Sequence, residues 1–141
     1  LAILSCSAQQ NKNTLSLVYQ PQDNGIGLRY DYQAGKIGVY TAFAHGFYNG
    51  YDKDNIYYRI EDHNKLAIGL SIQSKKSPVY LSFGLSAHNY GYKQLTKNID
   101  PIKLMPVSFE FGMSADISRV RAGFRFDPIK WEGSFEIGFN F

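Results

Sequence analysis

Apolar and polar residues alternate at every second position along most of this 141-residue chain. The alternation is longest at the C-terminal end, where the odd positions are apolar or small, namely Trp131, Gly133, Phe135, Ile137, Phe139 and Phe141. Successive side chains of a β-strand point to opposite faces, so positions 130–141 predict one long strand with an apolar and a polar face. Positions 118–126 alternate in the same way. The turn residues around Pro128 therefore predict a closing hairpin.

The charges of this hairpin predict its register. With position 127 opposite position 130, Arg125 lies opposite Glu132 and Arg121 lies opposite Glu136. Opposite charges attract in such cross-strand pairs, whereas a one-residue slip would place charges against aromatic side chains. We therefore predict a hairpin with one aromatic face and one charged face whose charges are paired.

Six further segments show the same alternation, which gives eight predicted strands: 13–20, 25–33, 36–48, 65–73, 78–88, 106–115, 118–126 and 130–141. Short polar turns predict hairpins, with a turn at 21–24 and with facing positions 33 and 36, 73 and 78, and 115 and 118. The two long connections are 49–64 and 89–105. Since no segment has helical periodicity, we predict an all-β fold, an eight-stranded antiparallel up-and-down barrel.

Such a barrel is either a soluble carrier with an apolar interior or a transmembrane barrel with a polar interior. The polar faces carry mainly small residues and charges that can pair, which suits the narrow lumen of eight strands. The apolar faces are uniform and have aromatic residues at strand ends, as at membrane interfaces. We therefore predict a transmembrane β-barrel with a polar lumen filled by side chains. Its predicted lumen ion-pair network is Arg29, Asp31, Glu110, Arg121, Arg125, Glu132 and Glu136.

Composition agrees with a β architecture. Aromatic residues make up 16% of the chain and charged residues 19%, which favours strands. The net charge of +3 is too small and too dispersed to indicate nucleic-acid binding. The sequence contains no run of 18 apolar residues, so it predicts no transmembrane helix.

The first eight residues resemble the end of an export signal, with a short apolar run followed by small residues. Cleavage after Ala8 would leave Gln9 as the mature N-terminus. In a second interpretation Cys6 is acylated, as in a lipoprotein, and in a third these residues only extend the N-terminus. We predict a residual signal segment at 1–8 and one barrel domain at 9–141.

The final strand is similar to the closing strand of the small eight-stranded outer-membrane barrels, of the OmpA transmembrane-domain and OmpX type. The residues that carry this resemblance are Phe135, Ile137, Phe139 and Phe141, and the resemblance implies that they form an outer-membrane assembly signal. It further implies a monomer in the outer membrane of a Gram-negative-type bacterium, with outer-membrane lipid and the assembly machinery as partners. The connections 49–64 and 89–105 would then be extracellular.

These two connections are rich in tyrosine, which supplies large contact area at low entropic cost. The predicted contact surface is Tyr51, Tyr57, Tyr58, Arg59, Tyr90 and Tyr92. We therefore predict a non-catalytic barrel whose loops serve surface binding, adhesion or envelope integrity, with an extracellular ligand as partner. The alternatives are a lipid A-modifying acyltransferase or deacylase, a narrow pore, and a soluble lipocalin-like carrier.

Residue types at two places in the sequence could indicate catalysis or metal binding. Ser86-Ala87-His88 carries the residue types of one class of lipid-modifying barrels in reverse order, and alternation places Ser86 and His88 in the lumen. His45 lies on the lipid-facing side without a carboxylate, and His63 lies in a predicted loop. The segment 52–55 offers oxygen ligands but lacks the glycine and distal glutamate of a calcium-binding loop. We predict no catalytic residue, no metal site and no cofactor.

Overall fold

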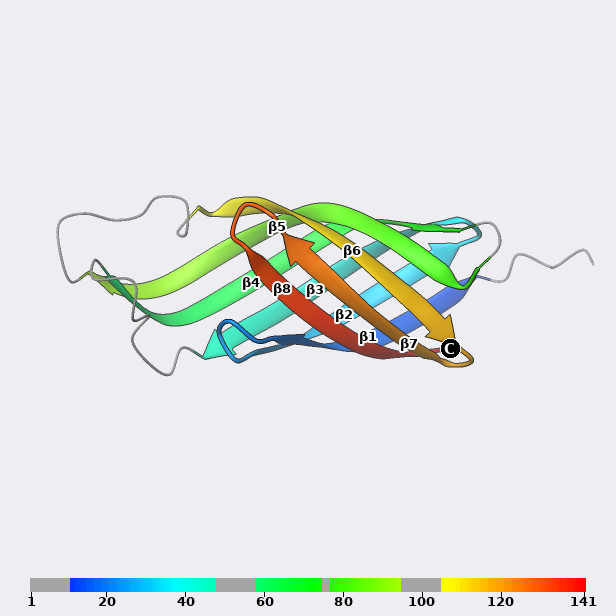
Figure 1. Ribbon diagram of the computed structural model, residues 1–141, viewed down its shortest axis with the longest axis horizontal. Coiled ribbons are helices and arrows are strands. Elements are labelled where there is room, and N and C mark those ends of the chain that lie inside the picture. Colours follow the sequence, from blue (N-terminus) through cyan, green and yellow to red (C-terminus); the bar gives the residue numbers. More distant parts are fainter. Residues whose placement is uncertain (1–10, 48–57, 75–76, 95–104) are drawn as a thin grey trace, which may run out of the picture.

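The computed structural model describes residues 11–47, 58–74, 77–94 and 105–141, which form eight strands. The strands are β1 (Lys12–Gln20), β2 (Gly25–Ala34), β3 (Ile37–Phe47), β4 (Tyr58–Gln73), β5 (Val79–Gln94), β6 (Val107–Ile117), β7 (Val120–Asp127) and β8 (Glu132–Asn140). Each strand pairs antiparallel with the next, and β1 pairs with β8 to close the barrel (Figure 1). The predicted fold class is confirmed.

The two ends of the barrel differ. At one end lie the C-terminus and the turns β2–β3, β4–β5 and β6–β7, and we call this the terminal end (Figure 1). We call the other end the loop end. Strands β3 and β5 finish there, β4 and β6 start there, and it also holds the turns β1–β2 and β7–β8. β4 and β5 extend furthest towards the loop end because they remain paired up to Tyr58 opposite Gln94, past a bulge between Ile60 and Asp62.

This extension corrects the predicted loops. Positions 58–64 and 89–94 were predicted to belong to the connections 49–64 and 89–105, but they lie in strands β4 and β5. Their alternation was hidden because polar residues occupy both faces there. At the loop end, these two strands are therefore recognised by their paired backbones rather than by their side-chain pattern.

The predicted registers were wrong by an even number of residues. Asp127 lies opposite Glu132 rather than position 130, so Arg125 faces Ser134 and Arg121 faces Gly138. The shifts arise in the turns. Here the hairpin contains four connecting residues, with Trp131 at φ 55°. The other three hairpins shift likewise, with facing pairs Gln33 and Gly38, Gln73 and Tyr80, and Ala115 and Ala122. Because side chains alternate with period two, an even shift leaves every residue on its predicted face.

The wall of the barrel is apolar outside and polar inside. Large apolar side chains point outward, such as Leu17, Ile68 and Phe111 with exposed fractions of 58%, 66% and 56%. Arg29 and Glu110 are buried in the interior. Exposed apolar area costs about 25 cal/mol per Å² in water, so this exterior favours hydrocarbon surroundings. A soluble carrier needs the opposite polarity, and the structure contradicts that alternative.

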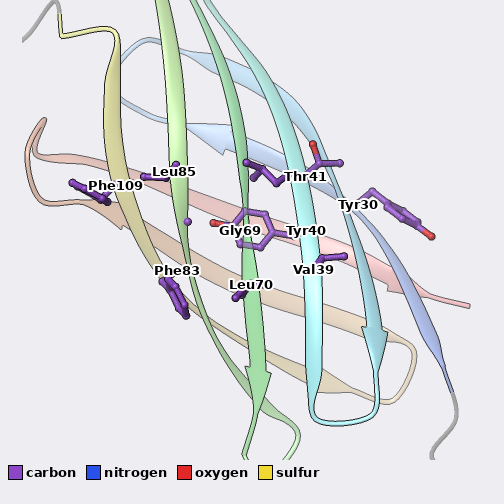
Figure 2. A pocket seen from close by; sticks show the side chains of 11 residues that line it. Tyr30, Val39, Tyr40, Thr41, Gly69, Leu70, Phe83, Leu85 and Phe109 are labelled. Carbon is purple, nitrogen blue, oxygen red and sulfur yellow. The ribbon is translucent and has the colours of Figure 1, made fainter.

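A shallow groove of about 540 Å³ runs over the outside of β3, β4 and β5 (Figure 2). It lies over Gly69 and Gly84, which face each other across β4 and β5. On the inner side these glycines make room for Tyr40, because a Cβ at Gly84 would lie 2.3 Å from the Tyr40 hydroxyl oxygen.

Among the residues described, no helix is long and apolar enough to cross a membrane.

Candidate functional site in the barrel lumen

An ion-pair lattice of buried side chains fills the middle of the lumen. Its centre is Glu110 on β6, which accepts hydrogen bonds from Arg125 Nη1 at 2.9 Å and from the Tyr40 hydroxyl at 2.8 Å. The Lys65 ammonium lies 2.7 Å from the second carboxylate oxygen. Arg125 also lies 3.1 Å from Glu136. Charges desolvated in this way are stable only when paired, and each side chain here has at least one opposite charge.

The lattice continues towards the terminal end. Arg29 binds Asp31 through two hydrogen bonds of 2.6 Å, and it lies 3.4 Å from Glu136. Arg121 donates to Asp116 at 2.8 Å. Arginine can make such paired, planar contacts because its guanidinium presents several donors in one plane. Two tyrosine rings complete the layer, with Arg29 stacked 3.8 Å from the ring centre of Tyr40 and Arg121 4.0 Å from that of Tyr80.

Six of the seven residues predicted for the lumen network meet in this lattice: Arg29, Asp31, Glu110, Arg121, Arg125 and Glu136. The seventh, Glu132, lies at the loop end, and the predicted pairs with Glu132 and Glu136 opposite Arg125 and Arg121 were wrong because of the register shift. Sequence reasoning missed Lys65, Tyr40, Tyr80 and Asp116. Lys65, Tyr40 and Tyr80 occupy positions that the alternation predicts to face the lumen, so the sequence did contain a signal for them.

Little space remains in this part of the lumen. A cavity beside Glu110 and Arg125 has a volume of only about 10 Å³, and small side chains such as Ala42 and Ala67 line it. One water molecule needs roughly this volume. The described lumen is therefore packed at the level of the lattice.

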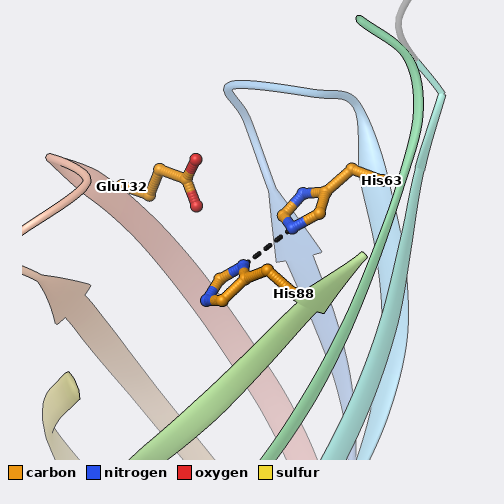
Figure 3. Close-up of side chains that lie close together, drawn as sticks. All are labelled: His63, His88 and Glu132. Atoms are coloured by element: carbon orange, nitrogen blue, oxygen red, sulfur yellow. Dashed lines mark hydrogen bonds between the residues drawn. The ribbon is translucent and has the colours of Figure 1, made fainter. Parts of the chain in front are cut away.

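A second polar cluster, which we call the histidine cluster, lies closer to the loop end of the lumen than the lattice does. His63 on β4 and His88 on β5 lie diagonally across this strand pair, with His63 Nε2 2.8 Å from His88 Nδ1 (Figure 3). The two rings are stacked, as is the ring of Tyr90 on His63 with centroids 4.3 Å apart. His63 was predicted in a loop, but it is buried on β4, because the β4–β5 ladder extends past it.

The turn between β1 and β2 holds one side of the cluster. The Asp23 carboxylate lies 2.7 Å from His63 Nδ1 and accepts the Gly25 N–H at 3.0 Å. Gly46 on β3 permits this position, because a Cβ there would lie 2.2 Å from Asp23 Oδ2. Asp23 therefore reaches His63 only where the opposing strand has no side chain.

Serines and the β7–β8 turn hold the other side. His88 Nε2 lies 2.8 Å from Ser86 Oγ and 2.9 Å from Ser108 Oγ. Ser108 donates a short hydrogen bond to the Asp127 carboxylate, which also accepts the backbone N–H groups of Ile129 and Lys130. A continuous hydrogen-bonded chain therefore crosses the lumen from Asp23 to Asp127.

Two further charged groups lie beside the histidine cluster. Glu132, the first residue of β8, is half-buried, and its donor atoms and those of both histidines lie within 4.8 Å of one another. The Lys130 ammonium donates to the Tyr90 hydroxyl at 2.8 Å. Burial lowers the pKa of Lys130, and the charge of Lys65 acts in the same direction, against the carboxylates of Glu132 and Asp127.

The remaining predicted site residues are placed as follows. The structure brings Ser86 and His88 together in the lumen, on the inner side of the wall. His45 pairs with Asn64 at 2.8 Å, away from the histidine cluster. The predicted assembly-signal residues all point outward: Phe135, Ile137, Phe139 and Phe141.

The predicted loop contact surface is described only in part. Tyr90 was predicted to be exposed, but it is half-buried and stacks on His63, so its ring belongs to the histidine cluster. Tyr58, Arg59 and Tyr92 are strand residues whose side chains lie outside the described part, as do Tyr51 and Tyr57 altogether. Residues 1–8 and 52–55 lie outside it as well.

A closed barrel of eight antiparallel strands with an apolar exterior and a packed, charged interior is the fold of the small outer-membrane β-barrels. The chain is similar in structure to the N-terminal β-barrel domain of Pseudomonas aeruginosa OprF, with a TM-score of 0.57 and 12% identity over 94% of this chain and 98% of that one. It is also similar to Ail, the attachment invasion locus protein of Yersinia pestis, in complex with the heparin analogue sucrose octasulfate. There the TM-score is 0.50 and the identity 13%, over 94% and 99% of the two chains.

No protein-family model matches the chain, and a comparison with the sequences of curated proteins gave no match. At 12% and 13% identity the two structures establish the fold. The resemblance to small eight-stranded outer-membrane barrels, predicted from the final strand, is confirmed at that level.

Proposed function

We propose that this protein is a monomeric barrel of the outer membrane of a Gram-negative-type bacterium that conducts no ions and catalyses no reaction. The observation that carries the proposal is the combination of an apolar exterior with an ion-pair lattice packed across the lumen. The exterior suits hydrocarbon, and the groove in Figure 2 suits an acyl chain of the surrounding lipid.

The lattice supports the non-conducting part of the proposal. Arg121 on β7 lies 3.8 Å from Asp31 on β2, and the Tyr40 hydroxyl on β3 donates to Glu110 on β6, so polar contacts join strands that are not neighbours in the wall and cross the lumen. Opening a path for ions would require these buried charges to separate, which costs several kcal/mol for each. A narrow pore is therefore the less supported alternative.

The position of Ser86 and His88 supports a non-catalytic role. Lipid A reaches the outside of the wall, whereas both side chains are buried on the inside. A lipid-modifying enzyme needs its nucleophile and base within reach of the substrate. This alternative is therefore less supported than a role for the loop end.

The role we propose is surface display: the loop end faces outward and serves binding, adhesion or envelope integrity. In small outer-membrane barrels the longer connections are extracellular. Ail, an attachment invasion locus protein that binds a heparin analogue in its crystal structure, has the same fold. We place the connections 48–57 and 95–104 outside the cell, and we assign Phe135, Ile137, Phe139 and Phe141 to recognition by the assembly machinery.

The test combines topology with conductance. An epitope inserted between positions 53 and 54 should bind antibody on intact cells, whereas the same epitope between Ser118 and Arg119 should bind only after permeabilisation. Purified protein in planar bilayers should give no stepwise conductance. Labelling of the second site on intact cells, or reproducible channel steps, would contradict the proposal.

The enzymatic alternative is tested separately. Mass spectra of lipid A from cells with the unmodified chain and with the variant His88→Ala should be the same, with His45→Ala as control. A change of acylation that depends on His88 alone would establish a lipid-modifying activity instead.

A further inference from the structure

The histidine cluster contains three side chains that can bind a metal ion, and their ligand atoms lie within 4.8 Å of one another. We propose that His63, His88 and Glu132 bind a divalent transition-metal ion, with Zn²⁺ as the best fit. Two imidazoles and one carboxylate are a donor set that zinc uses in proteins, with the fourth position open to water or another ligand. The three donors converge from β4, β5 and β8 (Figure 3).

The geometry is close to that of a zinc site. His63 Nε2 and His88 Nδ1 lie 2.8 Å apart. Zinc–nitrogen bonds of about 2.0–2.1 Å at a tetrahedral angle place two nitrogens about 3.3 Å apart, so the rings need to separate by only about 0.5 Å. The Glu132 carboxylate must move by more than the two rings to reach the same metal ion. It follows directly on a turn, and its side chain is half-buried, so it has freedom to move.

Both imidazoles have the outer partners that metal-binding histidines usually have. The Asp23 carboxylate accepts the His63 Nδ1 proton, which leaves the Nε2 lone pair directed at His88. For His88, the proton has two places: on Nδ1 it bonds to His63, and on Nε2 it bonds to Ser108.

The second tautomer frees His88 Nδ1 for a metal without loss of a proton. Ser108 already donates its own hydrogen to Asp127, so its oxygen can accept from both His88 and Ser86. The hydrogen bonds around His88 are therefore satisfied with the metal bound as well as without it.

Charge is compatible with a cation at this position. The carboxylates of Asp23, Asp127 and Glu132 surround the pair of rings, while the Lys65 ammonium is held by Glu110 at 2.7 Å. The Lys130 ammonium opposes the cation. Two neutral imidazoles disfavour Mg²⁺ and Ca²⁺, which prefer oxygen ligands.

The experiment uses the full chain without a polyhistidine tag, purified in detergent and stripped of metal with a chelator. Zn²⁺ is titrated in competition with a chromophoric chelator, and Mg²⁺ and Ca²⁺ are titrated in parallel. We expect one Zn²⁺ per chain. His63→Gln and His88→Gln should each weaken binding by more than about 100-fold, because loss of an outer partner alone costs about 10- to 100-fold. Glu132→Gln should weaken it by about 10-fold or more.

His45→Gln is the matched control, because His45 lies outside the cluster, and it should leave the affinity unchanged. Heat-modifiable gel mobility verifies that each variant is folded. If a variant does not fold, the Cu²⁺ electron paramagnetic resonance spectrum of the unmodified chain decides, since it should show coupling to two imidazole nitrogens. The proposal is overturned by absence of stoichiometric binding, by a spectrum without that coupling, or by folded variants of His63, His88 or Glu132 that retain full affinity.

Discussion

At the scale of single residues, the charges of the lumen are buried and the large apolar side chains of the wall point outward. Glu110 illustrates the cost and the solution. Its carboxylate is buried, and desolvation of such a group is expensive, but Arg125, Lys65 and Tyr40 all bind it. The lattice therefore depends on each partner, and removal of one partner leaves the others charged and unpaired.

We expect Glu110→Gln to lower the free energy of unfolding by about 3–5 kcal/mol, because Arg125 and Lys65 lose their shared carboxylate. Urea titration in lipid vesicles, followed by fluorescence of the only tryptophan, Trp131, measures the change. Asp62→Asn is the control, because this carboxylate is exposed and asparagine keeps the oxygen that accepts the Gly91 N–H, and it should change the free energy of unfolding by less than about 0.5 kcal/mol. Equal effects of the two substitutions would show that the lattice does not stabilise the barrel.

At the scale of elements, the histidine cluster depends on how strands and turns approach one another. Asp23 belongs to the β1–β2 turn, and it reaches His63 on β4 across Gly46 of β3. The missing Cβ of Gly46 is therefore as much a part of this contact as the two side chains that make it. A methyl group at position 46 has no room unless Asp23 moves.

We expect Gly46→Ala to displace Asp23 and to destabilise the barrel by about 1–3 kcal/mol, as overpacking does. In an Asp23→Ala background the same change should cost far less, because the clashing atoms are gone. Unfolding of the four proteins of this double-mutant cycle measures the coupling. Gly133→Ala, where the nearest atom to a Cβ is 3.4 Å away, is the control. Additive effects of the substitutions at 46 and 23 would argue against the contact.

At the scale of the whole molecule, closure and polarity act together. The pairing of β1 with β8 leaves no open edge, which hydrocarbon would not tolerate because unpaired backbone groups are costly there. The apolar side chains on the outside then form a belt whose contribution depends on depth in the bilayer. Ile68 lies in the middle of β4, and Ile117 lies at the terminal end beside the β6–β7 turn.

We therefore expect Ile68→Arg to destabilise the barrel in vesicles by about 2–4 kcal/mol and Ile117→Arg by about 0–1 kcal/mol, since the cost of arginine on the lipid face falls towards the interface. Reversible unfolding in vesicles compares the two substitutions, and both native side chains are largely exposed on the outside of the barrel, with exposed fractions of 66% and 74%. If both had the same small effect, the belt would not lie in hydrocarbon.

The alternation of residues by itself determined the number of strands, their antiparallel order, the face of nearly every side chain and thus the polarity of the wall. It could do so because a period of two is a local property, unaffected by the even register shifts that the turns around Gly35, Ser118 and Trp131 introduced. Most members of the ion-pair lattice could be predicted for the same reason.

Only the tertiary structure decided which inward side chains meet. Arg125 pairs with Glu110 and Glu136 rather than Glu132 because two-residue shifts change partners without changing faces. The hydrogen bonds of the histidine cluster join the β1–β2 turn to β4, β5, β6 and β7, which approach one another only after the barrel closes and β4 and β5 extend to the loop end. Side-chain partners across a lumen follow from register and closure, and those are properties of the whole barrel rather than of any segment.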